Sequence, residues 1–163
     1  LMKIVDLSES FNEGDWSVFR MRPNSVTGRW PGDVQGYMRV APIQVPIGET
    51  VYLAGYGLSK KTPELNYVQK VDYGPVIAYQ FPDQEPELSA PKRIFYTVST
   101  SGGNSGSPIV LTKTHEIIGV HTNGGCAFGD YNWGALIAYD GRFREAIRNC
   151  LAEEALELGP GAE

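Results

Sequence analysis

Residues 99–108 read Ser-Thr-Ser-Gly-Gly-Asn-Ser-Gly-Ser-Pro, a glycine-rich stretch between apolar runs that begin at Ile94 and Pro108. Glycines on both sides of Ser105 let the backbone approach a substrate closely and turn N–H groups inward, as an oxyanion-binding loop requires. Ser105 is therefore a candidate nucleophile. Clusters of Gly, Ser and Asn also form ordinary loops, so composition alone leaves both interpretations open.

Outside this stretch, short apolar or alternating runs recur along the chain, which is typical of β-strands. They cover residues 3–7, 16–21, 51–56, 67–71, 76–81, 94–99, 108–111, 117–121 and 135–139. Turn-forming residues separate the runs, and each supplies a fixed or positive φ. The clearest are Pro23-Asn24, Pro31-Gly32-Asp33, Tyr73-Gly74-Pro75 and Asn123-Gly124-Gly125. The pattern predicts antiparallel strands joined by hairpins.

One stretch has the period of a helix. After Asp140, a candidate N-cap, the residues Phe143, Ile147, Cys150 and Leu151 fall on one helical face. We expect a helix over 141–158 whose apolar stripe docks on a sheet, followed by a tail over 159–163. The predicted fold class is all-β with a C-terminal α-helix.

Composition excludes several function classes. The 163 residues carry 14 basic and 19 acidic side chains, and no basic cluster is longer than Lys60-Lys61, which argues against a nucleic-acid partner. No apolar run approaches the roughly 20 residues needed to cross a bilayer, so we expect no membrane partner.

Cys126 and Cys150 have neither CxxC spacing nor a nearby histidine pair, so no metal site is predicted. The two cysteines form at most one bridge. Cys150 on the apolar helix stripe is more simply a small buried hydrophobe than half of that bridge.

Gly103-Asn104-Ser105-Gly106-Ser107-Pro108 resembles the nucleophile signature of chymotrypsin-fold serine peptidases, in the form of the glutamyl endopeptidase branch. Segments 13–19, 51–57 and 118–125 and the closing helix resemble the same family in the same order. The resemblance implies an antiparallel Greek-key double β-barrel. Residues 1–45 would hold the last strands of the first barrel and the linker, and 46–140 the second barrel.

The resemblance also implies roles for individual residues. Ser105 takes the place of the nucleophile, and the N–H groups of Gly103 and Ser105 that of the oxyanion donors. Asp15 takes the place of the acid that orients the general-base histidine, and Thr122 would lie beside it and donate to it. Taken alone, Asp15 is more simply a solvated turn acid or a strand-end cap.

Substrate specificity would rest on His121 and Thr100, which in the glutamyl branch bind the acidic side chain of the substrate. The strand that continues through Thr122, Asn123 and Gly124 would line the specificity pocket and pair with the substrate backbone. A lone histidine on an apolar strand is more often a core residue satisfied by a neighbour. His115 is expected in a surface turn.

The sequence departs from the family pattern at the general base. The family's histidine precedes the aspartate by several tens of residues, whereas only residues 1–14 precede Asp15 here. We expect the histidine on an N-terminal segment or a separate chain. Asn104 replaces the aspartate that receives the new amino terminus in many trypsin-like enzymes, so activation would differ.

The resulting hypothesis is a serine endopeptidase that cleaves proteins or peptides after acidic residues, preferably Glu, through an acyl-enzyme and without metal or organic cofactor. The alternative is an inactive pseudopeptidase that binds a peptide in the same groove. The resemblance implies secretion, and the residues themselves carry no localisation signal.

Overall fold

The computed structural model describes residues 4–10, 15–59, 62–80, 93–125 and 131–158, with side chains from Asp15 to Ala152 within these ranges. Its contacts divide the chain into two compact units. One unit contains Leu1–Tyr37 and Gly141–Glu163, and the other contains Met38–Asp140. The strands of the second unit carry the glycine-rich stretch.

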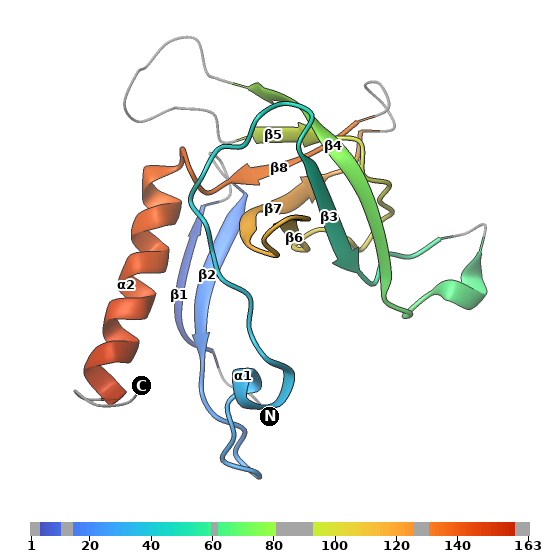
Figure 1. Ribbon diagram of the computed structural model, residues 1–163. Helices are drawn as coiled ribbons and strands as arrows, with labels where there is room; N and C mark the ends of the chain where they lie inside the picture. The colour runs from blue at the N-terminus through green and yellow to red at the C-terminus, as the bar shows by residue number, and fades with distance from the viewer. Residues whose placement is uncertain (1–3, 11–14, 60–61, 81–92, 126–130, 159–163) are drawn as a thin grey trace. The chain divides into compact units, whose positions relative to one another are not determined.

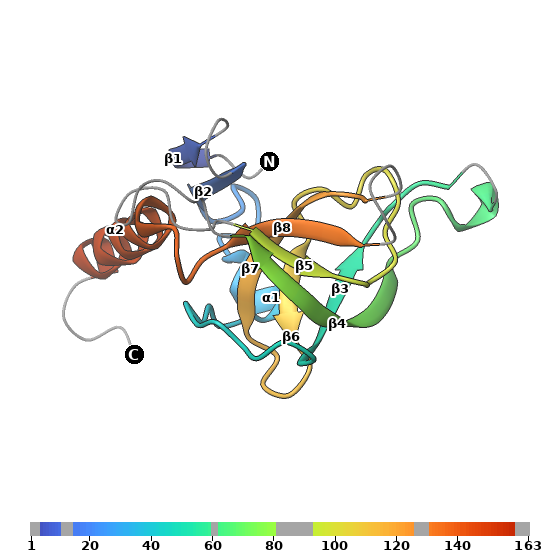
Figure 2. The ribbon, with the colours of Figure 1, turned by 90° about the horizontal axis from the view of Figure 1, so that it is seen from above.

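Six antiparallel strands of the unit Met38–Asp140 form a closed barrel (Figures 1 and 2). They are β3 (Thr50–Gly55), β4 (Lys70–Gln80), β5 (Arg93–Tyr96), β6 (Pro108–Leu111), β7 (Ile117–Asn123) and β8 (Asn132–Leu136), hydrogen-bonded in the order β3-β4-β5-β8-β7-β6. A short 3-10 helix, Pro63–Leu65, lies between β3 and β4 in the sequence. The closed ring confirms the predicted all-β class, and closure leaves its strands without an exposed edge.

The barrel encloses an aliphatic core. On β3, Val51 and Leu53 are buried while their neighbours are partly exposed, as the two-residue period of a strand requires. Burying one such side chain fully contributes about 1.5–3 kcal/mol. The fully buried members of the core are Val51, Val76, Ile94, Tyr96, Val98, Ile109, Ile118 and Leu136.

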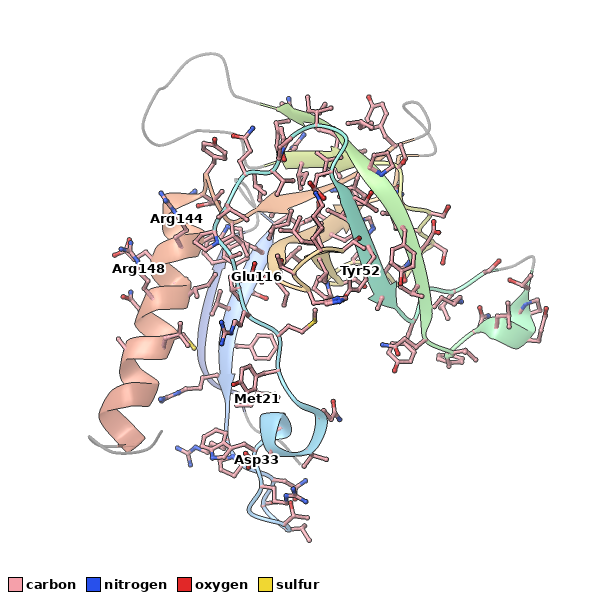
Figure 3. All side chains as sticks on the ribbon, viewed as in Figure 1. Met21, Asp33, Tyr52, Glu116, Arg144 and Arg148 are labelled. Carbon is pink, nitrogen blue, oxygen red and sulfur yellow. The ribbon has the colours of Figure 1, made fainter. Side chains whose placement is uncertain are left out.

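The other unit combines a hairpin with a helix. β1 (Ile4–Ser10) pairs antiparallel with β2 (Trp16–Met21), and the C-terminal helix α2 (Gly141–Leu158) packs against β2 (Figure 1). The rings of Trp16 and Phe143 stack in parallel with centroids 4.6 Å apart. Arg144 and Arg148, one turn apart on α2, project away from the hairpin (Figure 3). The predicted C-terminal helix is confirmed.

Two predicted details of this unit are wrong. Leu151 is 59% exposed, because the buried stripe of α2 runs through Phe143 and Ala146 instead, and Cys150 is only partly buried. The predicted turn at 31–33 is a short helix, α1 (Pro31–Gln35), since Pro31 has the φ of a first helical residue and the Asp33 carboxylate accepts the N–H of Trp30 at 2.9 Å.

Two predicted details of the barrel are wrong as well. Tyr73-Gly74-Pro75 is not a turn, because β4 runs through it and pairs there with Thr50–Tyr52 of β3. Gly74 is needed for space: a Cβ there would lie 2.7 Å from the backbone nitrogen of Val98. Second, β8 begins at Asn132 and ends at Leu136, three residues earlier than the run 135–139, because its first half pairs with Phe95 and Tyr96 of β5.

Among the described helices, none is long and apolar enough to span a membrane.

Candidate active site

The loop that carries Ser105, residues 99–107, follows β5 and leads directly into β6. Backbone hydrogen bonds from Asn104 to Ser101 (3.1 Å) and from Ser107 to Asn104 (3.0 Å) close two consecutive tight turns. Gly103 at φ +93° and Gly106 at φ +88° occupy backbone conformations that L-residues rarely adopt. The two glycines on either side of Ser105 are therefore required by the path of the chain. Below, residues 99–107 are called the Ser105 loop.

The backbone N–H groups of the Ser105 loop include used and unused donors. Those of Asn104, Gly106 and Ser107 donate to carbonyl groups and that of Ser99 donates to Asp72, whereas those of residues 100–103 and of Ser105 have no partner within the described part of the chain. Two unused N–H groups two residues apart in an exposed, glycine-rich loop are what an oxyanion-binding site needs. Gly103 and Ser105, the oxyanion donors that the resemblance implies, are among these unused donors, and their role remains a prediction.

The Ser105 hydroxyl is exposed and donates a hydrogen bond to the carbonyl oxygen of Thr122 at 3.3 Å. A carbonyl oxygen accepts this bond but is too weakly basic to take the proton in a reaction. Within the described residues, the hydroxyl of the candidate nucleophile is therefore bonded to no activating base.

Two backbone hydrogen bonds join the Ser105 loop to β7. Gly106 donates to the carbonyl of His121 at 2.9 Å, and His121 donates to the carbonyl of Ser107 at 2.8 Å. Together with the contact between Ser105 and Thr122, these bonds hold the candidate nucleophile beside the strand that sequence analysis assigned to substrate binding. The candidate nucleophile and His121 therefore lie on hydrogen-bonded neighbouring segments, and their joint role remains a prediction.

His121 is a core residue, 3% exposed, and its Nδ1 lies 2.6 Å from the hydroxyl oxygen of Tyr96. Burial lowers the pKa of His121 to about 4, so the imidazole is neutral at pH 7. Burial raises the pKa of Tyr96 above its ordinary value, so the phenol stays protonated. A core histidine satisfied by a neighbour was one of the two interpretations of His121, and Tyr96 is such a neighbour. Tyr96 contacts one ring nitrogen, Nδ1.

Asn132 connects two segments that flank this histidine. Its side-chain nitrogen donates to the carbonyl of Val98, and its oxygen accepts the N–H of Gly125 at 2.9 Å. One buried carboxamide thereby holds the start of the Ser105 loop against the end of β7. Sequence analysis missed Asn132 because it began the last strand at 135. A polar residue next to Trp133 in an apolar run was the available signal.

Thr100 lies near Gly124, at the end of β7. Its hydroxyl oxygen would be 3.6 Å from a Cβ added to Gly124, which is an ordinary van der Waals contact, so the two residues lie close together. The structure gives no hydrogen bond between Thr100 and His121. Their joint role in binding remains a prediction.

The two residues that follow His121 are placed as well. The Thr122 hydroxyl donates to the carbonyl of Trp133 at 3.4 Å and accepts from the side chain of Asn123 at 3.1 Å.

Asp15 is exposed, has φ +51° and belongs to the other unit. Its pairing with Thr122 remains a prediction.

A cavity of about 450 Å³ adjoins the Ser105 loop. Asp72 at this cavity accepts the N–H of Ser99 at 2.7 Å, and that bond holds the pKa of the carboxyl below its usual value. The Asn104 side chain fits against Gly55 and Gly57, where added Cβ atoms would lie 2.9 and 2.5 Å from its oxygen. The cavity is lined by Leu53, Ser59, Thr62, Lys70, Val71, Asp72, Ser99, Thr100, Ser101 and Asn104.

Within the described ranges, no three His, Cys, Asp or Glu side chains gather as metal ligands would. Cys126 lies outside the described residues.

His115 lies in the exposed turn between β6 and β7, where it has φ +57°. Its Nδ1 lies 3.2 Å from the hydroxyl oxygen of Tyr52 (labelled in Figure 3).

Comparison with solved structures identifies the fold. A Glu endopeptidase in complex with MPD shares 21% identity at a TM-score of 0.69, over 93% of this chain and 64% of its own. The inactivated protease paralogue S-I1 of the scabies mite shares 15% at 0.61, over 92% and 68%. An inactive form of the protease Rv3671c from M. tuberculosis shares 12% at 0.59, over 94% and 66%.

No protein-family profile and no curated protein sequence matches the chain. The chain spans 64% of the length of the Glu endopeptidase and 66% of that of Rv3671c. At these identities the likeness concerns the fold. This chain has the chymotrypsin type of protease fold, as the motif around Ser105 predicted.

Proposed function

From the chymotrypsin-type fold, we propose that this chain belongs to a serine endopeptidase that cleaves peptide bonds after acidic residues, with Glu preferred. One observation carries the proposal. The Ser105 side chain is exposed, the backbone N–H groups of Gly103 and Ser105 are unused within the described residues, and the loop is hydrogen-bonded directly to the strand of a buried, neutral histidine. The arrangement combines a nucleophile, an oxyanion site and a donor for a substrate side chain.

In the proposed reaction, Ser105 Oγ attacks the scissile carbonyl carbon and a general-base histidine takes the hydroxyl proton. The carbonyl oxygen becomes an oxyanion held by the N–H groups of Gly103 and Ser105, each of which contributes about 3 kcal/mol of transition-state stabilisation. The histidine returns the proton to the leaving amine as the peptide bond breaks. Water then hydrolyses the acyl-enzyme by the same steps in reverse.

The general base must come from elsewhere. Of the two histidines, His115 contacts Tyr52 and His121 is hydrogen-bonded to Tyr96 inside the barrel. We assign the base to a histidine on an N-terminal segment or a separate chain, with Asp15 orienting it.

Specificity follows from the donors near β7. A glutamate side chain brings two carboxylate oxygens that accept hydrogen bonds, and the His121 imidazole and the Thr100 hydroxyl can donate to them. Thr122, Asn123 and Gly124 pair with the substrate backbone. One neighbour in the structural comparison is itself a Glu endopeptidase, which supports this preference.

A peptide-binding pseudopeptidase is the second candidate. The Ser105 hydroxyl donates to the Thr122 carbonyl instead of to a base, and one structural neighbour is described as an inactivated protease paralogue. A protein of this kind would hold an acidic peptide without cleaving it.

A fluorophosphonate probe separates the two functions. The native preparation is treated with the probe, and the intact mass of every polypeptide in it is measured, with Ser105→Ala as the control. A probe adduct on this chain that disappears in Ser105→Ala supports the peptidase. If a folded sample also contains a second polypeptide that carries the general-base histidine and still forms no adduct, the result contradicts the peptidase and favours the pseudopeptidase.

Matched peptides with Glu or Gln before the scissile bond test the specificity. We expect His121→Gln to lower the Glu-to-Gln ratio of kcat/KM by about tenfold, which corresponds to one hydrogen bond to a charged group. An unchanged ratio would assign the side-chain contact to other residues.

A further inference from the structure

The pairing of His121 with Tyr96 occupies one of the two ring nitrogens. Tyr96 is fully buried and His121 is 3% exposed, and the hydroxyl oxygen of Tyr96 lies 2.6 Å from Nδ1 of His121. No hydrogen bond joins Nε2, the other ring nitrogen, to the residues that the structure describes, and Nε2 is not among their fully buried unpaired polar atoms. Nε2 therefore keeps some accessible surface, where a ligand atom can reach it.

The proton in this pair lies on the phenol. Within the described ranges, the Tyr96 hydroxyl has no hydrogen-bond partner besides Nδ1. If the imidazole donated to Tyr96, the phenolic O–H would be buried without an acceptor. If the phenol donates, only an oxygen lone pair is left unused, and a strong imidazole acceptor receives a strong donor. Tyr96 therefore donates to Nδ1.

The direction of this bond decides the tautomer of His121. A neutral imidazole carries one proton, and Nδ1 is occupied as an acceptor, so the proton lies on Nε2. The unused atom is then an N–H donor. Its ligand has to be a hydrogen-bond acceptor, and a carboxylate oxygen is the strongest acceptor that a peptide side chain offers.

We propose that Tyr96 is a positioning residue, which holds His121 as the Nε2–H tautomer so that a neutral donor meets the carboxylate of the acidic substrate side chain. The identity of the ligand rests on the proposed function, whereas the tautomer does not. The backbone of His121 is anchored on both sides by the Ser105 loop, through Gly106 and Ser107. Rotation of the ring is then the remaining freedom, and the Tyr96 hydroxyl restrains it.

Nitrogen NMR of the histidine rings tests the tautomer. In a long-range 1H–15N spectrum at neutral pH, the ring of His121 is identified as the signal that His115→Gln keeps and His121→Gln loses. We expect a neutral ring protonated at Nε2 in the otherwise native chain, and a mixture of tautomers after Tyr96→Phe. A proton on Nδ1, or a charged ring, would overturn the assignment. The spectrum without the Tyr96 substitution decides this even if that variant fails to fold.

The kinetic readout uses the same matched Glu and Gln peptides. We expect Tyr96→Phe to lower the Glu-to-Gln ratio of kcat/KM about fivefold, chiefly through KM, because Ser105 and its oxyanion donors are unchanged. Tyr79→Phe is the matched control, since the Tyr79 hydroxyl also donates inside the barrel unit, to the carbonyl of Val45 at 2.7 Å. This control should leave the ratio unchanged.

The outcomes separate the inference from the proposed function. If Tyr96→Phe changes neither the tautomer nor the ratio while the wild type still prefers Glu, Tyr96 has no positioning role and the peptidase stands. If the tautomer depends on Tyr96 but the wild type cleaves equally after Glu and Gln, the tautomer assignment is upheld and the acidic specificity is wrong.

Discussion

Glycines in the Ser105 loop and glycines in the barrel strands serve different physical needs. Gly103 and Gly106 have φ of +93° and +88°, and a Cβ on either would meet no atom closer than 3.7 Å. On β8 and β7, added Cβ atoms on Gly134 and Gly119 would lie 2.2 Å and 2.4 Å from carbonyl oxygens of the neighbouring strand. The loop thus needs glycine for its backbone conformation, and the barrel needs it for space.

The difference matters because the two kinds of glycine meet at the candidate site. Gly134 lies opposite His121 in the pairing of β7 with β8, and Gly106 binds the carbonyl of the same histidine. The conformational glycines shape the Ser105 loop, and the crowded ones let strands β7 and β8 approach each other. Substitutions should therefore separate activity from stability.

The largest effect is expected for Gly134→Ala. The new methyl group would overlap the carbonyl of Val120 at 2.2 Å and the Ile109 side chain at 2.6 Å, and a backbone atom cannot move aside as a flexible side chain can. We expect a loss of about 3 kcal/mol in the free energy of unfolding, measured by urea denaturation.

Gly102→Ala is the matched control, because no atom lies within 4 Å of its added Cβ and its φ is not positive. It should change the free energy of unfolding by less than about 0.5 kcal/mol. Equal losses in the two variants would contradict the distinction between crowded and open positions.

The next effect is a pH dependence of the free energy of unfolding, and it comes from His121 on β7. Burial holds the pKa of His121 in the folded chain at about 4, below its ordinary value of 6.5, so the unfolded chain binds the proton more tightly. The resulting stability is complete above about pH 6.5 and is lost as the pH falls to about 4, by up to about 1.4 kcal/mol for each pH unit. Urea denaturation at several pH values measures it.

His121→Gln should remove this part of the pH dependence, and His115→Gln at the exposed turn should keep it. If the curve of His121→Gln parallels that of the wild type between pH 6.5 and 4, the buried imidazole is not the titrating group.

The smallest effect on stability is expected in the Ser105 loop. Gly103→Ala places a side chain at φ +93° and should cost about 1 kcal/mol in the free energy of unfolding, through the backbone alone. Gly103→Asn should cost less, because Asn tolerates positive φ better than Ala. A larger loss for Asn than for Ala would indicate crowding instead of conformation at this position.

Local sequence signals were sufficient wherever the chemistry is contained in one segment. The positive φ of Gly103 and Gly106 and the exposure of Ser105 follow from residue types within a few positions of one another. The strands β2 and β6 were predicted with their observed bounds, since an apolar run ends where its turn begins.

Contacts between residues that are far apart in the chain were not predicted. Tyr96 and Asn132 face each other across β5 and β8, and they supply the hydroxyl on His121 and the carboxamide that joins Val98 to Gly125. Nothing near either residue indicates these contacts. Gly74 was misread as part of a turn for the same reason, because the atoms that require it belong to Thr97 and Val98.

Residue patterns alone were enough to predict the fold class and the glycine conformations of the Ser105 loop, because periodicity and glycine conformation act over a few residues. Only the tertiary structure decided which nitrogen of His121 is occupied, what holds the segments around it together and which glycines are irreplaceable. Those properties depend on atoms that barrel closure brings within hydrogen-bond distance from strands many residues apart.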